Sequence, residues 1–91
     1  MITLGFAAGY CDVVTIDTAL PLTSMYLYVN GTAGDIVFEN SAGQAQYFPN
    51  AQAGILLPLA ASRVVSAATV NGTPRTTTAT DIVYMATGKA V

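Results

Sequence analysis

The sequence contains few of the residues that most often carry chemistry. Its 91 residues include no histidine, no tryptophan and a single cysteine, Cys11. One cysteine cannot form a disulfide within the chain, and the usual zinc sites of cysteine and histidine need histidine or more cysteines. The nucleophilic mechanisms that use Ser–His–Asp or Cys–His also lose their base. We therefore expect no enzyme, no metal site and no cofactor.

Charge is equally scarce. Charged residues make up 9% of the chain and hydrophobic residues 53%, whereas about 25% of the residues in a typical domain are charged. A domain of this length buries only about 60–65% of the surface that its unfolded chain exposes, so small folds usually need a disulfide, a metal or oligomerisation. The composition disfavours a disulfide and a metal site, so oligomerisation is the remaining way to stabilise the fold. We expect a surface that is largely covered by partners.

Two classes of partner are disfavoured. The apolar stretch 53–62 is about half as long as the ~20 residues of a membrane-spanning helix, and Pro58 interrupts it. The N-terminus lacks the basic region of a signal peptide. The formal net charge is −2 and the three basic residues are scattered, whereas nucleic-acid binding favours a basic stripe. We expect neither a membrane nor a nucleic acid as partner.

The pattern of the chain is that of short strands. Alanine is interleaved with threonine, valine and glycine, and no segment has the spacing of a helix. Several short strands about 8–12 residues apart predict an all-β fold, a single small antiparallel β-sandwich or barrel-like domain of about six to eight strands over residues 12–91. The expected strands are residues 12–17, 24–30, 35–40, 44–48, 55–59, 62–70 and 80–86.

Residues 1–11 are a candidate N-terminal arm. This segment is apolar and contains glycines, and its large side chains are Ile2, Leu4, Phe6 and Tyr10. Such a composition suits an arm that docks on a neighbour. We expect that deleting residues 1–9 weakens attachment or oligomer stability.

Turn residues separate the strands. Asn30-Gly31 and Asn71-Gly72 are favoured hairpin dipeptides, because both residue types tolerate positive φ. Residues 41–43 form a short connection with a glycine at its end. The stretch SMYLYVNGTAGDIVFEN therefore predicts an antiparallel hairpin between residues 24–30 and 35–40.

The expected strands are apolar on both faces. In residues 24–30, Met25, Leu27 and Val29 share one face, and Tyr26 and Tyr28 share the other. A half-buried strand would alternate apolar with polar residues. We interpret the second face as covered by another subunit, with cover by the chain's own N-terminal segment as the alternative.

The same doubling recurs in two other expected strands. Ile36 and Phe38 lie on one side of their strand, and Val37 and Glu39 lie on the other. Near the C-terminus Ile82 and Tyr84 oppose Val83 and Met85.

The ionisable residues do not form a recognisable site. Asp35 and Glu39 are about 13 Å apart along an extended strand, too far for an acid–base pair. Asp12 and Asp17 could contribute to a calcium site with backbone carbonyls, but no D-x-D-x-[DN]-G pattern is present. Cys11 is interpreted as a small packing residue because nothing nearby lowers its pKa.

Two further features have a structural interpretation. The loop NGTAGD lacks both the lysine and the spacing of a phosphate-binding loop, which favours a turn. Arg63 lies within a β-like run. It could pair with Glu39 or Asp81 across strands, anchor an interface as arginine often does, or be a surface charge on an edge strand.

The order of short motifs resembles a known family. An aromatic–aliphatic strand, a TAGD turn, a G-x-x-x-x-F strand, an AGxxLPL segment and a final TxATDIVYM strand occur in that order over about two-thirds of the chain. The corresponding segments are Tyr26–Gly31, Thr32–Ile36, Gly43–Phe48, Ala51–Val64 and Thr77–Met85. The ordered set resembles the head spike base proteins, small structural proteins of tailed phages and gene transfer agents.

Two segments depart from that pattern. The family's LPLR-x-x-R portion reads LPLAASR at residues 57–63, so one of its two basic residues is absent, and residues 70–78 form a longer loop. The missing arginine puts one partner contact in doubt.

The resemblance implies a virion role without catalysis. The chain would be a homo-oligomeric spike base or decoration (cement) protein, a pentamer or trimer. It would bind the major capsid protein on the capsid surface and carry a fibre protein in some particles. It would be made in the cytoplasm of the bacterial host. The alternatives are a tail or adaptor component, and a carbohydrate- or host-surface-binding β module whose tyrosines stack on sugars.

From the residues and the resemblance together we expect the interface to draw on a set of large side chains. These candidates are Phe6, Tyr10, Tyr26, Tyr28, Val37, Phe38, Tyr47, Arg63, Val83, Tyr84 and Met85.

Overall fold

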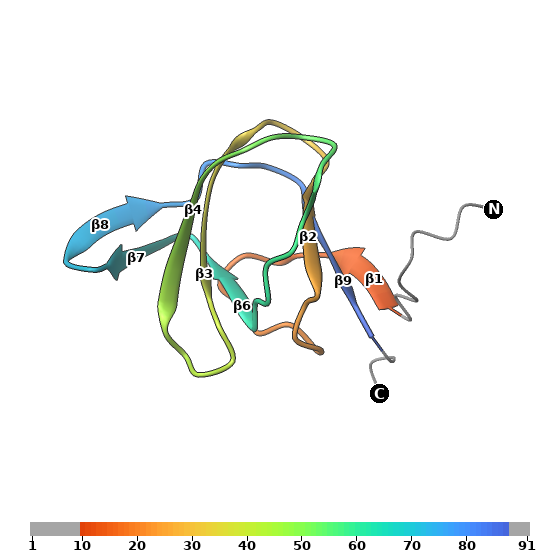
Figure 1. The fold of residues 1–91 in the computed structure, drawn as a ribbon, viewed down its shortest axis with the longest axis horizontal. Coiled ribbons are helices and arrows are strands. Elements are labelled where there is room, and N and C mark those ends of the chain that lie inside the picture. Colours follow the sequence, from red (N-terminus) through yellow and green to blue (C-terminus); the bar gives the residue numbers. More distant parts are fainter. Residues whose placement is uncertain (1–9, 88–91) are drawn as a thin grey trace.

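The computed structural model describes residues 10–87 of the chain, and these residues form an all-β domain with no helix (Figure 1). The predicted fold class is therefore confirmed. No helix that could span a membrane is found in this part of the chain. The strands are β1 (Tyr10–Val13), β2 (Tyr26–Val29), β3 (Gly34–Glu39), β4 (Ala45–Ala51), β5 (Leu56–Leu57), β6 (Arg63–Val65), β7 (Ala67–Val70), β8 (Thr73–Thr76) and β9 (Ile82–Ala86).

The strands form two sheets and a separate hairpin. Sheet A has four strands in the order β1-β9-β2-β5, and sheet B has three in the order β4-β3-β6. All neighbours within these sheets are antiparallel. The β7–β8 hairpin pairs only with itself and lies on the side of sheet B that faces away from sheet A. The result is a sandwich with a third, partial layer.

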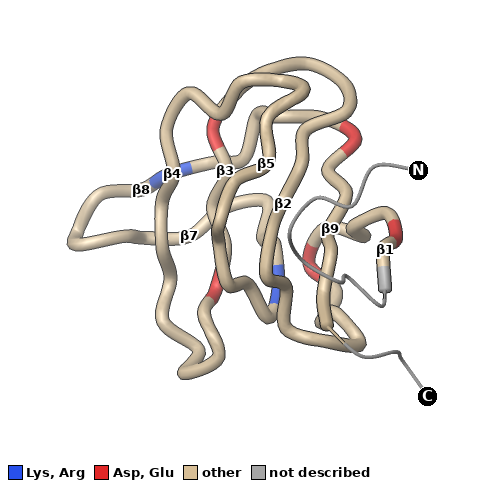
Figure 2. Tube along the Cα trace, turned by 45° about the vertical axis from the view of Figure 1, so that its right-hand side comes forward, with Lys and Arg blue, Asp and Glu red and all other residues tan. Residues whose placement is uncertain are grey.

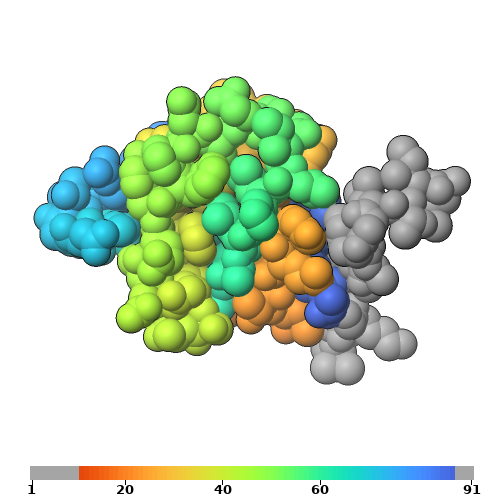
Figure 3. Space-filling model, in the orientation of Figure 1, coloured from red at the N-terminus to blue at the C-terminus, as the bar shows by residue number. Residues whose placement is uncertain are grey.

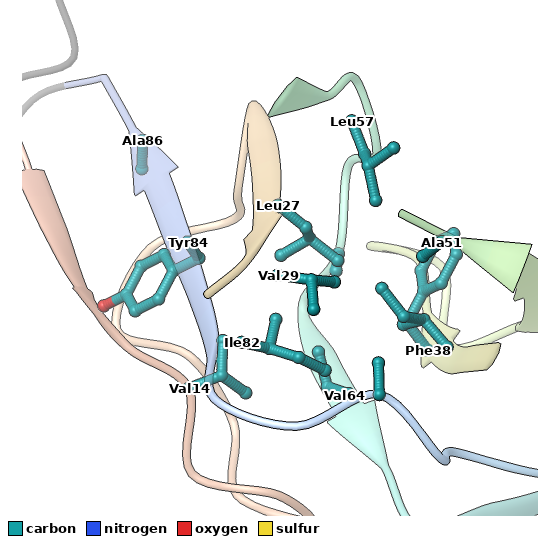
Figure 4. Close-up of a cluster of buried hydrophobic side chains, with 13 residues drawn as sticks. Val14, Leu27, Val29, Phe38, Ala51, Leu57, Val64, Ile82, Tyr84 and Ala86 are labelled. Carbon is teal, nitrogen blue, oxygen red and sulfur yellow. The ribbon is translucent and has the colours of Figure 1, made fainter. Parts of the chain in front are cut away.

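The hydrophobic core fills the space between the two sheets (Figure 4). Leu27 and Val29 of β2 pack toward Ile36 of β3, and all three are fully buried. Tyr84 of β9 is only 1% exposed. The core side chains alternate along each strand, as period-2 burial requires. The predicted division of β2 and β9 into two faces is therefore confirmed, and the face that carries Leu27, Val29 and Tyr84 is the inner one.

The predicted hairpin between residues 24–30 and 35–40 is wrong. β2 pairs with β9 and β5, whereas β3 pairs with β4 and β6, so the two strands belong to different sheets. The connection binds the segment before β9 instead of folding back on itself. The backbone N–H of Asn30 donates to Asp81 O at 2.9 Å, and that of Thr32 donates to Thr80 Oγ1 at 2.7 Å.

The glycine of Asn30-Gly31 allows the backbone to lie close to that of Thr80. Gly31 has no positive φ, but a Cβ at this position would lie 2.9 Å from the carbonyl oxygen of Thr80. Its own N–H donates to that oxygen at 3.2 Å. The dipeptide therefore marks a crossing between sheets. The other predicted hairpin turn, Asn71-Gly72, is confirmed between β7 and β8, with φ of 50° and 82°.

The expected strand 62–70 is broken in two at Ser66. The backbone N–H of Ser66 donates to Asp17 Oδ1 at 2.9 Å, and its hydroxyl donates to Asp17 Oδ2 at 2.8 Å. This contact fixes the point at which β6 leaves sheet B and β7 begins. The β8 strand was not predicted, because its Thr-Pro-Arg-Thr sequence lacks an apolar alternation.

The threonine-rich segment after β8 satisfies the backbone of β3. Thr78 Oγ1 accepts the N–H of Asp35 at 2.8 Å. Thr77 Oγ1 accepts the N–H of Val37 at 2.9 Å and donates to the carbonyl oxygen of Val65 at 2.6 Å. Along part of β3, threonine hydroxyl groups thus accept the backbone hydrogen bonds that the carbonyl groups of a neighbouring strand would otherwise accept.

Replacing Thr77 with valine tests that arrangement. Valine keeps the shape but removes both hydrogen bonds, which leaves the N–H of the fully buried Val37 without its acceptor. We expect Thr77→Val to lower the free energy of unfolding by about 1–3 kcal/mol. The neighbouring Thr76, whose side chain is exposed, is the control: Thr76→Val should change it by less than about 0.5 kcal/mol. Urea unfolding of the two variants measures the difference, and equal losses would contradict the role given to the Thr77 hydroxyl.

Candidate interaction surface

The outer face of sheet A is formed by two rows of side chains that run across its strands. In one row Val13, Val83, Tyr28 and Leu56 are successive cross-strand partners. In the other row Cys11, Met85 and Tyr26 are aligned in the same way. Directly paired residues point to the same side of a sheet. The outer face of sheet A is defined as these seven residues.

The outer face of sheet A carries no charged side chain. β2, β5 and β9 contain no charged residue at all (Figure 2). The one charge of β1, Asp12, is the cross-strand partner of the buried Tyr84 and so belongs to the other side of the sheet. Val13 is 63% exposed, Cys11 is exposed, and the other five members are partly exposed. An uncharged apolar face across neighbouring strands is a candidate interaction site.

The outer face of sheet B has a different environment. Val37 is fully buried and Val65 is 7% exposed, although both point away from the core between the sheets. The β7–β8 hairpin covers this side: β7 contacts β4 and β8 contacts β3. The guanidinium of Arg75 lies 4.3 Å from the centre of the Tyr47 ring, a cation–π distance. The second face of β3 is therefore covered by the chain's own β7–β8 hairpin. Neither another subunit nor the N-terminal segment, the two covers expected from the sequence, covers Val37.

The predicted interface candidates divide between these environments. Tyr26, Tyr28, Val83 and Met85 lie together on the outer face of sheet A. Phe38 and Tyr84 are core residues, and Val37 and Tyr47 lie beneath the hairpin. Phe6 lies outside the described residues, as does the predicted arm apart from residues 10 and 11, which begin β1.

Three members of the outer face were not among the candidates. Val13 and Leu56 occur in short apolar runs whose alternation was not assigned to a face, and Cys11 was interpreted as a packing residue. These three residues are assigned to the outer face by their cross-strand pairing with Val83, Tyr28 and Met85. Such pairing between strands cannot be derived from the local sequence. Tyr10 has no described side chain.

Arg63 lies on sheet B, opposite Glu39 in the register of β6 and β3. It is partly buried, and its Nε is buried without a hydrogen-bond partner among the described residues. Its charge contributes to lowering the pKa of Asp17, after the hydrogen bonds from Ser66. It is therefore placed away from the outer face of sheet A.

The carboxylates hold loops in place. Asp35 Oδ1 accepts the backbone N–H of Asn50 at 2.9 Å, and Oδ2 accepts the hydroxyl of Tyr47 at 3.0 Å. Among the described residues no three His, Cys, Asp or Glu side chains are grouped so that they could hold a metal ion. A cavity of about 200 Å³ lies between β1 and residues 15–21, with Tyr84 and Asp12 in its lining. It holds a single carboxylate, so it offers no acid–base pair.

The two loop-holding carboxylates predict acid sensitivity. The backbone N–H of Ser66 lowers the pKa of Asp17 from its usual 3.8, and that of Asn50 lowers the pKa of Asp35. Because both pKa values are depressed on folding, the stabilisation is present above about pH 4 and is lost as the pH falls through the folded values. We expect the urea midpoint to fall between about pH 4 and pH 2.

The Asp35→Asn variant separates this effect from general acid denaturation. It should be less stable than the wild type at pH 7 and should lose less of its remaining stability on acidification. Urea titrations at pH 7, 4, 3 and 2 give the dependence of stability on pH for the wild type and for the variant. If stability falls equally with pH in both, Asp35 does not contribute to the acid sensitivity.

Comparison with known proteins yields no relative: no family model, no curated protein and no solved structure matches this chain. The functional inference therefore depends on the outer face of sheet A and on the motif order of the sequence.

Proposed function

We propose that this chain is a non-enzymatic structural subunit of a tailed phage or phage-like particle. In this role it assembles with itself and attaches to the capsid surface as a spike base or decoration protein. The observation that carries the proposal is the uncharged outer face of sheet A. The motif order resembles that of the head spike base proteins, and this resemblance is the reason for proposing a phage particle as the assembly.

The surface chemistry supports assembly over catalysis. An enzyme site needs convergent polar groups in a concave pocket, whereas the outer face of sheet A offers tyrosine, valine, leucine and methionine side chains across four neighbouring strands. Aromatic residues and methionine are enriched in the centres of protein interfaces, and charged residues are depleted there. The face therefore has the composition of an interface centre.

Copurification with particles tests the proposal. Particles produced from the genome that encodes this chain are purified on a density gradient, and their proteins are quantified by mass spectrometry. We expect the chain in the particle band at a fixed ratio to the major capsid protein, and we expect electron microscopy with a specific antibody to label the head. Recovery only from the particle-free fractions would overturn the proposal, and labelling of the tail would favour a tail or adaptor component instead.

A glycan-binding module is the second candidate, motivated by Tyr26 and Tyr28. Their rings lie in adjacent rows of the outer face of sheet A, where both are partly exposed. Of the other tyrosines, Tyr84 is buried and Tyr47 is stacked under Arg75. Sugar sites also need hydrogen-bonding groups beside the stacking ring, and no charged or amide side chain belongs to this face. A glycan array tests this candidate. A binding signal that the Tyr28→Ala variant loses would favour the glycan-binding module over the structural subunit.

A further inference from the structure

The tetrapeptide Val-Asn-Gly-Thr occurs twice in the chain, at residues 29–32 and 70–73. Asparagine is a thermolabile residue, and it is most reactive before glycine, because the backbone nitrogen of the next residue attacks the side-chain amide and glycine has no side chain to obstruct it. The two copies have the same intrinsic reactivity, since the residues on both sides of the reacting bond are identical. A difference between them in the folded protein must therefore come from the structure.

The backbone of the first copy is held by hydrogen bonds on both sides of the reacting bond. The N–H of Asn30 donates to the carbonyl oxygen of Asp81 at 2.9 Å. The N–H of Gly31, which carries the attacking nitrogen, donates to the carbonyl oxygen of Thr80 at 3.2 Å. Thr32 exchanges two further bonds with Thr80, at 2.7 and 3.1 Å. Attack by the Gly31 nitrogen would therefore break its own hydrogen bond and displace a segment that joins the two sheets.

The second copy forms the tip of the β7–β8 hairpin, which protrudes from the rest of the described residues (Figure 3). Asn71 and Gly72 are the two residues between the strands, and both are exposed. Among the described residues, the N–H of Gly72 donates no backbone hydrogen bond. A Cβ at Gly72 would meet nothing within 4 Å. The attacking nitrogen of this copy is therefore neither hydrogen-bonded to the described backbone nor crowded.

The two copies differ in the size of the opening that the reaction needs. The side chain of Asn30 is exposed as well, so exposure alone does not distinguish them. Asn71 has a φ of 50° in a tight turn, and this turn has to open before the nitrogen of Gly72 can reach the side chain. Because the hairpin pairs only with itself, its tip can open while both sheets stay folded. Openings at exposed tips cost much less free energy than openings of the core.

We propose that Asn71 is a site of spontaneous deamidation in the folded protein and that Asn30 is protected from it. The backbone nitrogen of Gly72 gives its proton to hydroxide and attacks Cγ of Asn71. The new N–Cγ bond closes a succinimide ring, and the side-chain nitrogen leaves as ammonia after it takes a proton from water. Water then opens the ring. Cleavage at Cγ gives aspartate, and cleavage at the backbone carbonyl gives isoaspartate.

Both products change the β7–β8 hairpin. Each adds a carboxylate to a hairpin whose only charged residue is Arg75. Isoaspartate also lengthens the backbone by a methylene group within the two-residue turn that aligns Val70 with Thr73, and the length of a hairpin loop sets its register. The hairpin covers the fully buried Val37. The isoaspartate form should therefore have a lower urea midpoint than the unmodified protein.

Incubation of the folded, full-length protein at mildly alkaline pH tests the proposal. Samples are taken over time and digested, and the peptides that contain Asn30 and Asn71 are quantified by mass spectrometry after the aspartate and isoaspartate products are separated. We expect deamidation at Asn71 to be at least about tenfold faster than at Asn30, which corresponds to opening free energies that differ by ~1.4 kcal/mol or more. Equal rates at the two sites, or a faster reaction at Asn30, would overturn the proposal.

Two controls show whether the structure causes the difference. In urea above the unfolding transition the two sites should react at the same rate, because their local sequences are identical. A preference for Asn71 that persists there would contradict the structural cause. Asn71→Gly removes the side-chain amide and keeps a residue that tolerates positive φ, so the acidic form that isoelectric focusing detects should no longer appear. An undiminished acidic form in this variant would overturn the assignment. The reaction needs no partner, so its outcome is independent of the particle experiment.

Discussion

Gly34→Ala is expected to lower the free energy of unfolding by about 3 kcal/mol or more. Gly34 opens β3 where the strand lies against the threonine-rich segment. A Cβ at this position would lie 2.7 Å from the backbone nitrogen of Ala79 and 2.8 Å from the carbonyl carbon of Thr78. Because these are backbone atoms, no rotamer change relieves the contact. Overpacking of this kind costs about 1–3 kcal/mol, and here it also pushes on hydrogen bonds.

The hydrogen bonds at stake join β3 to the chain before β9. Asp35 donates its N–H to Thr78 Oγ1 at 2.8 Å, and its carbonyl oxygen accepts the N–H of Thr78 at 2.9 Å and of Ala79 at 3.1 Å. Shifting either segment lengthens all three, and each is worth about 0.5–1.5 kcal/mol.

Gly43→Ala is the matched control for this variant. Gly43 has a positive φ of 79°, but a Cβ there would meet nothing within 4 Å. Its alanine variant should lose only the roughly 1–2 kcal/mol of left-handed strain. Denaturant titration of both variants gives the comparison. If Gly43→Ala proves the more damaging, the close approach of β3 to residues 78–79 is not what requires glycine.

Leu27→Ala is expected to cost about 2–5 kcal/mol of stability, the usual range for a buried leucine. Leu27 is fully buried and is the cross-strand partner of both Leu57 and Tyr84, so the space that it leaves is bounded by two strands and by sheet B. A domain of this length has a total stability of roughly 5–14 kcal/mol. The loss is therefore a large part of the total, and the variant should melt well below the wild type.

Ile55→Ala is the control for Leu27→Ala. Ile55 is 51% exposed, so this variant removes a similar side chain from a surface position, where the change should stay within about 0.5 kcal/mol. Differential scanning calorimetry of both variants at the same protein concentration measures the contrast. Similar losses in the two would mean that Leu27 is not a core residue.

The sequence predicted the fold class and the sides of individual strands. Period-2 alternation was enough to place Leu27 and Val29 on one side of their strand and Tyr26 and Tyr28 on the other, because alternation is a property of one strand. The turn at Asn71-Gly72 was predicted for the same reason, since positive φ is a local requirement.

Strand pairing could not be predicted in the same way. Asn30-Gly31 has the residues of a hairpin turn, yet the chain there crosses between sheets, because hydrogen bonds to Thr80 and Asp81 replace the turn. These partners are about fifty residues away in sequence. The cover of Val37 was missed for a related reason: it comes from a hairpin whose second strand looks like a polar loop.

The reactivity of Cys11 tests most directly whether the outer face of sheet A is covered. Cys11 is the only cysteine of the chain and is exposed on β1, so a thiol reagent such as 5,5′-dithiobis(2-nitrobenzoic acid) reports on this face alone. The rate of labelling per thiol should fall as the protein concentration rises through the assembly midpoint of the wild type. It should stay constant for Tyr28→Asp over the same range. An unchanged rate in a wild-type sample that sedimentation shows to be assembled would contradict the account, because the copies would then meet through another surface.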